Sequence, residues 1–346
     1  MGDAWLGAFR GDDGSHLWTI QVGSEKSDNV TSVAATASGS AVFACGNTYG
    51  EVADGSFIGK GDVWVLKADG KTGKIAWTVQ IGSDKNDDSM SLVSTPSGDA
   101  VYVVGHTFGG YVADGYDHTP QDDGTKPGGR DGFVAKLDGR NGRLMWGRVI
   151  GTDRVDFLND VAVSPDGEAR GGKMAIRRHF DASVPRARFS EIHASRAPRK
   201  MIARPKQKER ETAGRGVGHV APRSRPGETI YVGGQTYGDF DKPIAGKSDA
   251  WIAKLDAFDG ATAWTAQFGE LGRDSVQAVM VAPDGDVVAA GHSDSNFGGC
   301  SSGLMDAWVA RVNPEHAHSF FSELDHEHAA GHACPHKKEN GVTKRE

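Results

Sequence analysis

The chain has 346 residues, of which 48 are glycine and 25% are charged, and its formal net charge at pH 7 is −7. Glycine at this level without a Gly-X-Y period excludes a collagen helix and indicates many tight turns. No run of about 18 apolar residues is present, so no transmembrane helix is predicted, and the three cysteines match neither a disulfide framework nor a zinc motif.

The charge is unevenly distributed along the chain. Residues 169–228 hold 16 Lys or Arg residues and 5 Asp or Glu residues, so this segment is strongly basic while the remainder is acidic. The N-terminal Met-Gly-Asp-Ala-Trp leads directly into an expected strand and shows no apolar core of a signal peptide. We therefore expect either a cytosolic protein or a gene product whose N-terminus is missing, and these alternatives leave the localisation open.

A repeated unit of about 60 residues begins at the N-terminus. Each copy opens with an aspartate, a small residue and an aromatic residue, and the copies start at Asp3, Asp62, Asp131, Asp249 and Asp306. A turn glycine, a tryptophan, a second glycine, a second aspartate and a third glycine follow at constant intervals in the first four copies. The tryptophans are Trp18, Trp77, Trp146 and Trp264, and the second aspartates are Asp28, Asp87, Asp156 and Asp274. These constant intervals predict a structural repeat.

Each unit predicts four β-strands in chain order. The first strand is short and apolar, over residues 63–68 and 251–255, as is typical of a strand buried on both faces. The second carries the tryptophan, over residues 75–81, 144–150 and 263–268. The third is expected over residues 30–36, 90–95, 158–164 and 276–282, and the fourth over residues 41–47 and 100–106.

Two kinds of glycine turn connect these strands. The segments ending in Gly14, Gly73 and Gly142 provide the positive-φ residue that a tight hairpin needs. The segments Pro-Ser-Gly98 and Pro-Asp-Gly285 combine the fixed φ of proline with a left-handed residue, which is the signature of a turn. All connections within a unit are therefore predicted to be hairpins.

Four antiparallel strands per unit predict an all-β fold, a β-propeller with about four to five four-stranded blades. A parallel solenoid is the competing architecture, and hairpin connections without amphipathic helices disfavour it. The terminal pieces, which begin at Asp3 and Asp306, overlap by one strand. The chain is therefore expected to be a fragment of a larger ring or a small imperfect ring.

The third unit is interrupted after Glu168 and resumes at Thr229. Excising residues 169–228 restores the glycine spacing of the first two units. The predicted organisation is propeller blades over 1–168, a disordered basic insertion over 169–228, propeller blades over 229–313 and a flexible His-rich tail over 314–346.

Three interpretations of the insertion remain open. It is a gene-model artefact such as a retained intron, a tolerated disordered loop, or a basic arm for an anionic surface. Surfaces that bind nucleic acid usually add aromatic stacking groups, and only Phe180 and Phe189 accompany the basic residues here. No nucleic-acid partner is therefore expected.

The repeat resembles the bacterial-type β-propeller repeat of exported and cell-surface proteins, including S-layer-like glycoproteins. The resemblance is carried by Asp131-Gly-Phe-Val-Ala-Lys-Leu-Asp138, Asp249-Ala-Trp-Ile-Ala-Lys-Leu-Asp256 and Tyr231-Val-Gly-Gly-Gln-Thr236. It implies an extracellular or cell-surface location and no common activity.

The hairpin Gly73-Lys-Ile-Ala-Trp77 is also similar to the tryptophan motif of quinoprotein dehydrogenases. That resemblance implies a strand frame in which the chain opens with two strands of one blade, adds three complete blades and ends with three strands. Those enzymes share a vicinal cysteine pair, and no adjacent cysteines occur here. We therefore expect no quinone cofactor.

The repeated aspartates Asp28, Asp87, Asp156 and Asp274 are predicted to have a structural role, because a catalytic residue is normally needed once. We expect each carboxylate to accept backbone N–H bonds in the loop between neighbouring blades, with one calcium site per blade as the alternative. Asp84, Asn86 and Asp88 have the alternating oxygen ligands that open a calcium loop, but Ser89 and Thr95 depart from the EF-hand pattern. A solvated loop without cofactor is the favoured interpretation, and Ca²⁺ is the cofactor kept as the alternative.

The C-terminal tail is rich in histidine, and its spacing is irregular. Imidazole groups at close spacing can chelate zinc, nickel or copper. A flexible tail is favoured over a metal site. The candidate metal ligands in the tail are His326, His328 and His332.

The segments after the fourth strand vary most between copies, and variable loops on a rigid scaffold are where recognition normally occurs. The aromatic side chains Tyr111, Tyr116 and Phe297 in these segments are the candidate ligand contacts. His106 and His292 occupy equivalent strand ends and are interpreted as structural rim positions. The predicted function is a non-catalytic scaffold that binds a protein or glycan through rim loops. The alternative is a propeller enzyme, either a quinone-type oxidoreductase or a hydrolase, whose active residues are not identifiable.

Overall fold

The computed structural model describes residues 2–53, 58–109, 129–164, 228–295 and 305–314. All of the described residues belong to one unit of the chain, Met1–Arg170 with Pro222–Glu346. In the described part of this unit every regular element is a β-strand.

The strands follow the repeat along the chain. In order they are β1 (Ala4–Phe9), β2 (His16–Val22), β3 (Asp28–Ala35), β4 (Ala41–Thr48), β5 (Asp62–Asp69), β6 (Ile75–Ile81), β7 (Asp87–Ser94), β8 (Ala100–Thr107), β9 (Asp131–Asp138), β10 (Leu144–Ile150), β11 (Asp156–Val163), β12 (Thr229–Thr236), β13 (Asp249–Asp256), β14 (Thr262–Phe268), β15 (Asp274–Val281), β16 (Val287–Ser293) and β17 (Asp306–Val312).

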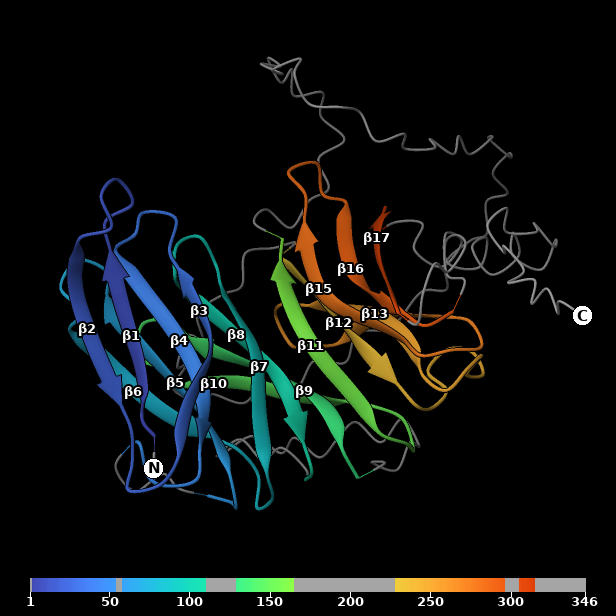
Figure 1. Cartoon of the computed structure of the whole chain (residues 1–346), viewed down its shortest axis with the longest axis horizontal. Helices are drawn as coiled ribbons and strands as arrows, with labels where there is room; N and C mark the ends of the chain where they lie inside the picture. Colours follow the sequence, from blue (N-terminus) through green and yellow to red (C-terminus); the bar gives the residue numbers. More distant parts are fainter. Residues whose placement is uncertain (1, 54–57, 110–128, 165–227, 296–304, 315–346) are drawn as a thin grey trace, which may run out of the picture. The chain divides into compact units, whose positions relative to one another are not determined.

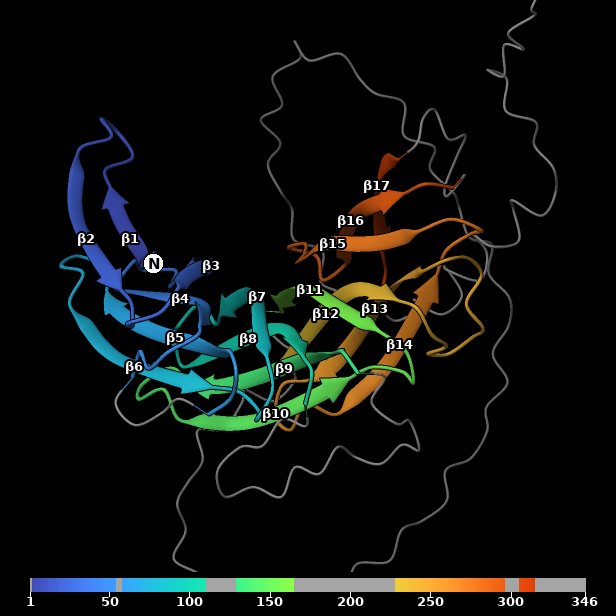
Figure 2. The ribbon, with the colours of Figure 1, turned by 60° about the horizontal axis from the view of Figure 1, so that its bottom comes forward.

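Within each sheet, strands that are consecutive in the chain pair antiparallel, so each sheet is a meander (Figure 1). Among the described residues, three sheets have four strands: β3 to β6, β7 to β10 and β11 to β14. The sheet of β1 and β2 has two strands and the sheet of β15 to β17 has three. This division confirms the expected frame of two strands, three complete blades and three strands, and the fold is a β-propeller. Figure 2 shows β7, β8, β9 and β10 side by side in chain order.

β3, β7 and β11 are the first strands of the complete blades and correspond to the third strand predicted for the repeat. Each begins earlier than expected. Residues 30–36 were predicted as a strand, whereas β3 starts at Asp28, because Asp28 already pairs with Thr48 of β4. β7 and β11 likewise begin at Asp87 and Asp156. The repeated aspartate is therefore the first residue of the blade and is held by the sheet on one side and by the preceding loop on the other.

The predicted turn glycines have positive φ, which confirms their role. They are Gly14, Gly39, Gly73, Gly98, Gly142, Gly260 and Gly285. The central strands are buried on both faces, as their continuous apolar sequence predicted; every residue of β8 and β9 is buried. Phe43 of one blade shares an apolar cluster with Leu92 and Phe133 of the next blade.

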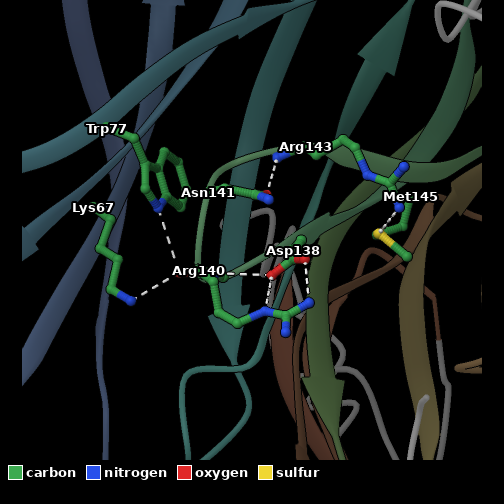
Figure 3. A network of polar contacts seen from close by, with 8 residues as sticks. Lys67, Trp77, Asp138, Arg140, Asn141, Arg143 and Met145 are labelled. Atoms are coloured by element: carbon green, nitrogen blue, oxygen red, sulfur yellow. Dashed lines mark hydrogen bonds and ion pairs between the residues drawn. The ribbon is translucent and has the colours of Figure 1, made fainter. Parts of the chain in front are cut away.

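The repeated tryptophans connect one blade to the next. The indole N–H of Trp18 donates to the carbonyl oxygen of Gly70 at 3.1 Å, that of Trp77 to Gly139 at 3.3 Å, and that of Trp146 to Ala257 at 3.3 Å. Each acceptor lies in the hairpin turn of the following sheet. Figure 3 shows the second of these contacts, where Lys67 and Trp77 both point toward the β9–β10 turn.

The long insertion lies within a hairpin. The N–H of Ser164 donates to the carbonyl oxygen of Thr229 at 2.9 Å, and Val163 pairs with Ile230. The corresponding bond in an uninterrupted hairpin joins Thr95 to the carbonyl oxygen of Ala100. β11 and β12 are therefore neighbours with the same closing bond, although residues 165–227 lie outside the described part. No helix in that part has the length and apolar character needed to cross a bilayer.

Candidate binding rim

One edge of each complete blade carries both the loop from the preceding blade and the variable segment after its second strand. We call this edge the rim. At the rim, the repeated aspartate organises the incoming loop. Asp87 Oδ2 accepts the N–H of Ser83 at 2.6 Å, and Asp156 Oδ2 accepts the N–H of Thr152 at 2.6 Å. The hydroxyls of Ser83 and Thr152 donate to the same oxygens at 2.9 Å.

Burial has an electrostatic consequence for these carboxyl groups. It raises the pKa of Asp87, Asp156 and Asp274, because the charged form loses hydration, and hydrogen bonds from neighbouring Ser and Thr residues offset part of this effect. The second glycine of the repeat gives this arrangement its space. A Cβ atom on Gly82 would lie 2.8 Å from Asp62 Oδ1 and 3.0 Å from Asp87 Oδ2.

The segment after the second strand begins with the tripeptide threonine, aromatic residue, glycine in three blades. The threonine hydroxyl accepts the N–H of the glycine two residues later, at 3.0 Å for Thr48, 3.0 Å for Thr107 and 2.9 Å for Thr236. This local turn is a side-chain substitute for a backbone turn. It fixes the direction of the residue between them.

That middle residue is an aromatic side chain that faces solvent. Tyr49 is 51% exposed, Phe108 is 45% exposed and Tyr237 is 40% exposed. Their backbone N–H groups donate to the loop from the preceding blade, to the carbonyl oxygens of Ser27, Asn86 and Val155. We call these three residues the rim aromatics. They are exposed although the backbone that carries them is rigidly bonded, and no packing role in the core accounts for them.

The fourth blade changes the motif. Ser293 and Ser295 keep the local turn, with the Ser295 N–H donating to Ser293 Oγ at 3.0 Å. Asp294 takes the aromatic position and pairs with Arg273 Nε at 3.1 Å. The aromatic feature is therefore a property of the three preceding copies rather than a requirement of the fold.

A charged residue joins two of the rim aromatics across a blade boundary. Arg130 precedes β9, and its Nη2 lies 2.8 Å from His106 Nδ1 at the end of β8. Its guanidinium carbon is 4.7 Å from the centroid of the Phe157 ring and 5.3 Å from that of Phe108. Phe157 is the second residue of β11 in the next blade, and its ring centroid lies 6.3 Å from that of Tyr237.

The residues of the predicted calcium loop contact other groups of the protein. Asp84 pairs with Lys85 at 2.6 Å and is largely exposed, while Asp88 Oδ2 lies 3.8 Å from Arg130 Nη2. The carbonyl oxygen of Asn86 accepts the N–H of Phe108. Within the described ranges no group of three or more His, Cys, Asp or Glu residues could hold a metal ion.

Several predicted site residues lie outside the described residues. These are Tyr111, Tyr116, Phe297, His326, His328 and His332. Trp18 and Trp146 are buried, whereas Trp77 is partly buried. His106 is buried against Arg130 and Phe157, which is a rim position as expected, and His292 is the last residue but one of β16, at the equivalent place.

The rim aromatics and Arg130 are not among the site residues predicted from the sequence. A signal for the first was present, because the tripeptide recurs as Thr48-Tyr49-Gly50, Thr107-Phe108-Gly109 and Thr236-Tyr237-Gly238. Arg130 had no such signal, since its position holds Gly61 and Ser248 in the other complete blades.

No family model and no curated protein matches the chain. Among solved structures, the chain is similar to the crystal structure of BamB from Moraxella catarrhalis, with 14% sequence identity and a TM-score of 0.25. The match covers 83% of this chain, and the chain spans 66% of the length of that structure. A likeness at this level carries no information on activity or partners.

Proposed function

We propose that this chain is a non-catalytic β-propeller scaffold that binds a protein or a glycan through the rim. The observation that carries the proposal is the recurrence of one exposed aromatic side chain at the same place in three blades: Tyr49, Phe108 and Tyr237. Aromatic rings combine a large apolar face with few rotatable bonds, so they lose little conformational entropy on binding. Their hydrogen-bonded backbone lowers that entropy loss further.

Polar side chains stand beside these rings and supply directional contacts. Gln235 Nε2 donates to Tyr237 Oη at 3.2 Å, and Asn47 Oδ1 accepts the N–H of Ser89 in the neighbouring blade at 2.7 Å. Asp88 is about one-third exposed beside Arg130. Binding sites commonly combine aromatic surfaces with a small number of fixed polar groups.

The proposal includes membership of the exported or cell-surface repeat family that the sequence resembles. Its support is the repeat spacing, which the strand frame reproduces blade by blade. Immunodetection of the native protein in secreted, surface and cytosolic fractions tests this part. Recovery in the cytosolic fraction alone would contradict it.

The binding proposal is tested with a triple variant, Tyr49→Ala, Phe108→Ala and Tyr237→Ala, on arrays of glycans and of purified surface proteins. The expected result is at least a tenfold loss of affinity, about 1.4 kcal/mol, for each ligand that binds the natural chain. Phe258→Ala is the matched control, because Phe258 is 66% exposed but lies in the β13–β14 turn at the opposite edge. Equal loss in the control, or binding that survives the triple variant, would contradict the proposal.

A further inference from the structure

At the junction between the β7–β10 blade and the β11–β14 blade, one cationic group lies among aromatic rings. The Arg130 guanidinium contacts the rings of both Phe108 and Phe157. Its central carbon is 5.3 Å from the centroid of the Phe108 ring and 4.7 Å from that of the Phe157 ring. One rim aromatic, Phe108, and the ring of Phe157 therefore flank one fixed positive charge, and a second rim aromatic, Tyr237, lies beside Phe157.

The charge is held in place but is not neutralised by a direct bond. Arg130 Nη2 donates to His106 Nδ1, which places the imidazole proton on Nε2. Burial, together with the adjacent guanidinium, lowers the pKa of His106 to about 3, so this partner is neutral. The nearest Asp88 oxygen is 3.8 Å from Nη2, which is longer than a hydrogen bond.

Two donors in this cluster have no hydrogen-bond acceptor in the described part of the chain. They are Arg130 Nε and His106 Nε2. His106 is 2% exposed, and a buried donor without an acceptor is rare in folded proteins and calls for an explanation. A guanidinium offers five N–H donors in a planar fork, and the Arg130 side chain is 27% exposed. Arg130 Nε and His106 Nε2 are themselves buried, so it is the exposed part of the Arg130 guanidinium that offers positive charge and N–H donors at the rim surface.

We propose that Arg130 is the acidic-group subsite of the rim and that the ligand is a glycan containing uronic acid. The sugar faces would pack on Phe108 and Tyr237, while the carboxylate would pair with Arg130. Guanidinium and carboxylate groups match in a bidentate geometry. The inference rests on the proposed function and names the ligand class of the same rim.

The chemistry of the surface favours a glycan over a protein partner. The rim aromatics are single rings separated by polar groups such as Asn47, Asp88 and Gln235. Protein interfaces are typically organised around a fully buried core that is more apolar than the surrounding rim. A sugar presents both C–H groups and hydroxyl groups. The C–H groups can pack on an isolated aromatic ring, while the hydroxyls form hydrogen bonds with the polar side chains beside it.

The test uses the full chain and calorimetric titration with uronate oligosaccharides built from galacturonate, glucuronate or mannuronate. Each is paired with its methyl ester, which keeps the sugar and removes the charge. The expected result is that at least one free acid binds tenfold or more tightly than its ester. Arg130→Gln should abolish this preference of the acid over its ester, whereas Arg130→Lys should retain part of it.

Arg154→Gln is the matched control, because Arg154 is exposed in the rim loop of the β11–β14 blade and its loss changes the net charge equally. Thermal melts establish whether each variant is folded. If Arg130→Gln does not fold, the comparison of Arg130→Lys with the natural chain still tests the inference. Equal affinity for acid and ester in every pair would overturn the inference. So would equal competition by an acidic peptide, which would indicate a protein ligand. If neutral glycans bind through the rim aromatics in the same experiments, the proposed function stands while this inference fails.

Discussion

At the residue scale, His106 shows how one repeat position takes on a new role. The equivalent positions are Asn47 and Gln235, which make neutral hydrogen bonds. In this blade the imidazole accepts from Arg130 and packs edge-on against Phe157, with ring centroids 5.0 Å apart. The histidine therefore behaves as a neutral acceptor that orients a cation.

The pH dependence of stability follows from that role. The pKa of His106 falls from 6.5 to about 3 on folding, so between these values the unfolded chain binds a proton that the folded chain does not. The free energy of unfolding should therefore decrease as pH falls through this window, by up to about 1.4 kcal/mol per pH unit from this group. Replacing His106 with Gln should remove this contribution.

Chemical denaturation of both chains at several pH values between about 7 and 4 measures the effect. The natural chain should lose stability relative to His106→Gln as pH falls. Gln is the residue at the equivalent position 235, so the replacement suits the local backbone. A difference between the two chains that stays constant with pH would show that His106 has the same pKa in the folded and the unfolded chain.

At the scale of the element, the glycine of the hairpin turn packs against the tryptophan of the preceding blade. Gly142 has φ of 76°, as the predicted turn requires, and a Cβ atom there would lie 2.8 Å from Trp77 of the preceding blade. The constant interval between turn glycine and tryptophan therefore has two causes, backbone conformation and contact with the next copy. Only the first was evident in the sequence.

A pair of substitutions separates these causes. Gly14→Ala imposes the left-handed strain alone, since φ is 71° and no described atom lies within 4 Å of the new Cβ; we expect a loss of about 1 kcal/mol. Gly142→Ala adds the clash with Trp77 and should lose roughly 2 to 4 kcal/mol. Thermal and urea unfolding of both variants measures the difference. Equal losses would mean that the tryptophan relaxes without cost.

The β11–β12 hairpin gives a prediction about the insertion. Deleting residues 169–228 leaves Ser164-Pro-Asp-Gly-Glu168 joined to Thr229, which matches Thr95-Pro-Ser-Gly-Asp99 before Ala100. Glu168 would then stand where Glu228 now accepts the Tyr102 hydroxyl at 3.1 Å. The shortened chain should fold and be more stable by roughly 2 kcal/mol, from the smaller loop-closure entropy. Failure to recover a cooperative melt would show that the segment is needed for folding.

At the scale of the molecule, blades differ in how completely they are covered. Every residue of β8 and β9 is buried, whereas Trp5 is 61% exposed and Phe9 is 54% exposed in the two-stranded sheet of β1 and β2. Asp160 links the inner strands of three sheets, because its carboxylate accepts from Ser91 at 2.6 Å and from the N–H of Val279 at 2.8 Å. Stability is therefore expected to be highest in the central blades.

Hydrogen exchange measures this gradient. Amides of β1 and β2 should exchange through local opening, well before those of β8 and β9, because fewer apolar contacts are lost when the two-stranded sheet opens. Mass spectrometry of peptic fragments resolves the two regions. Equal protection in both would indicate that the sheets unfold as a single unit.

The sequence by itself determined the strands, the turn glycines and the division into blades, because these depend on local backbone preference and on intervals that the chain itself carries. It placed Asp28, Asp87 and Asp156 at loops between blades, with strand starts two or three residues too late. Only the tertiary structure decided that Tyr49, Phe108 and Tyr237 are exposed while Tyr102 and Tyr231 are buried. It also decided that Arg130 lies against Phe157. Exposure and contacts across blades depend on which side chains a neighbouring sheet covers, and that information is absent from the spacing within one repeat.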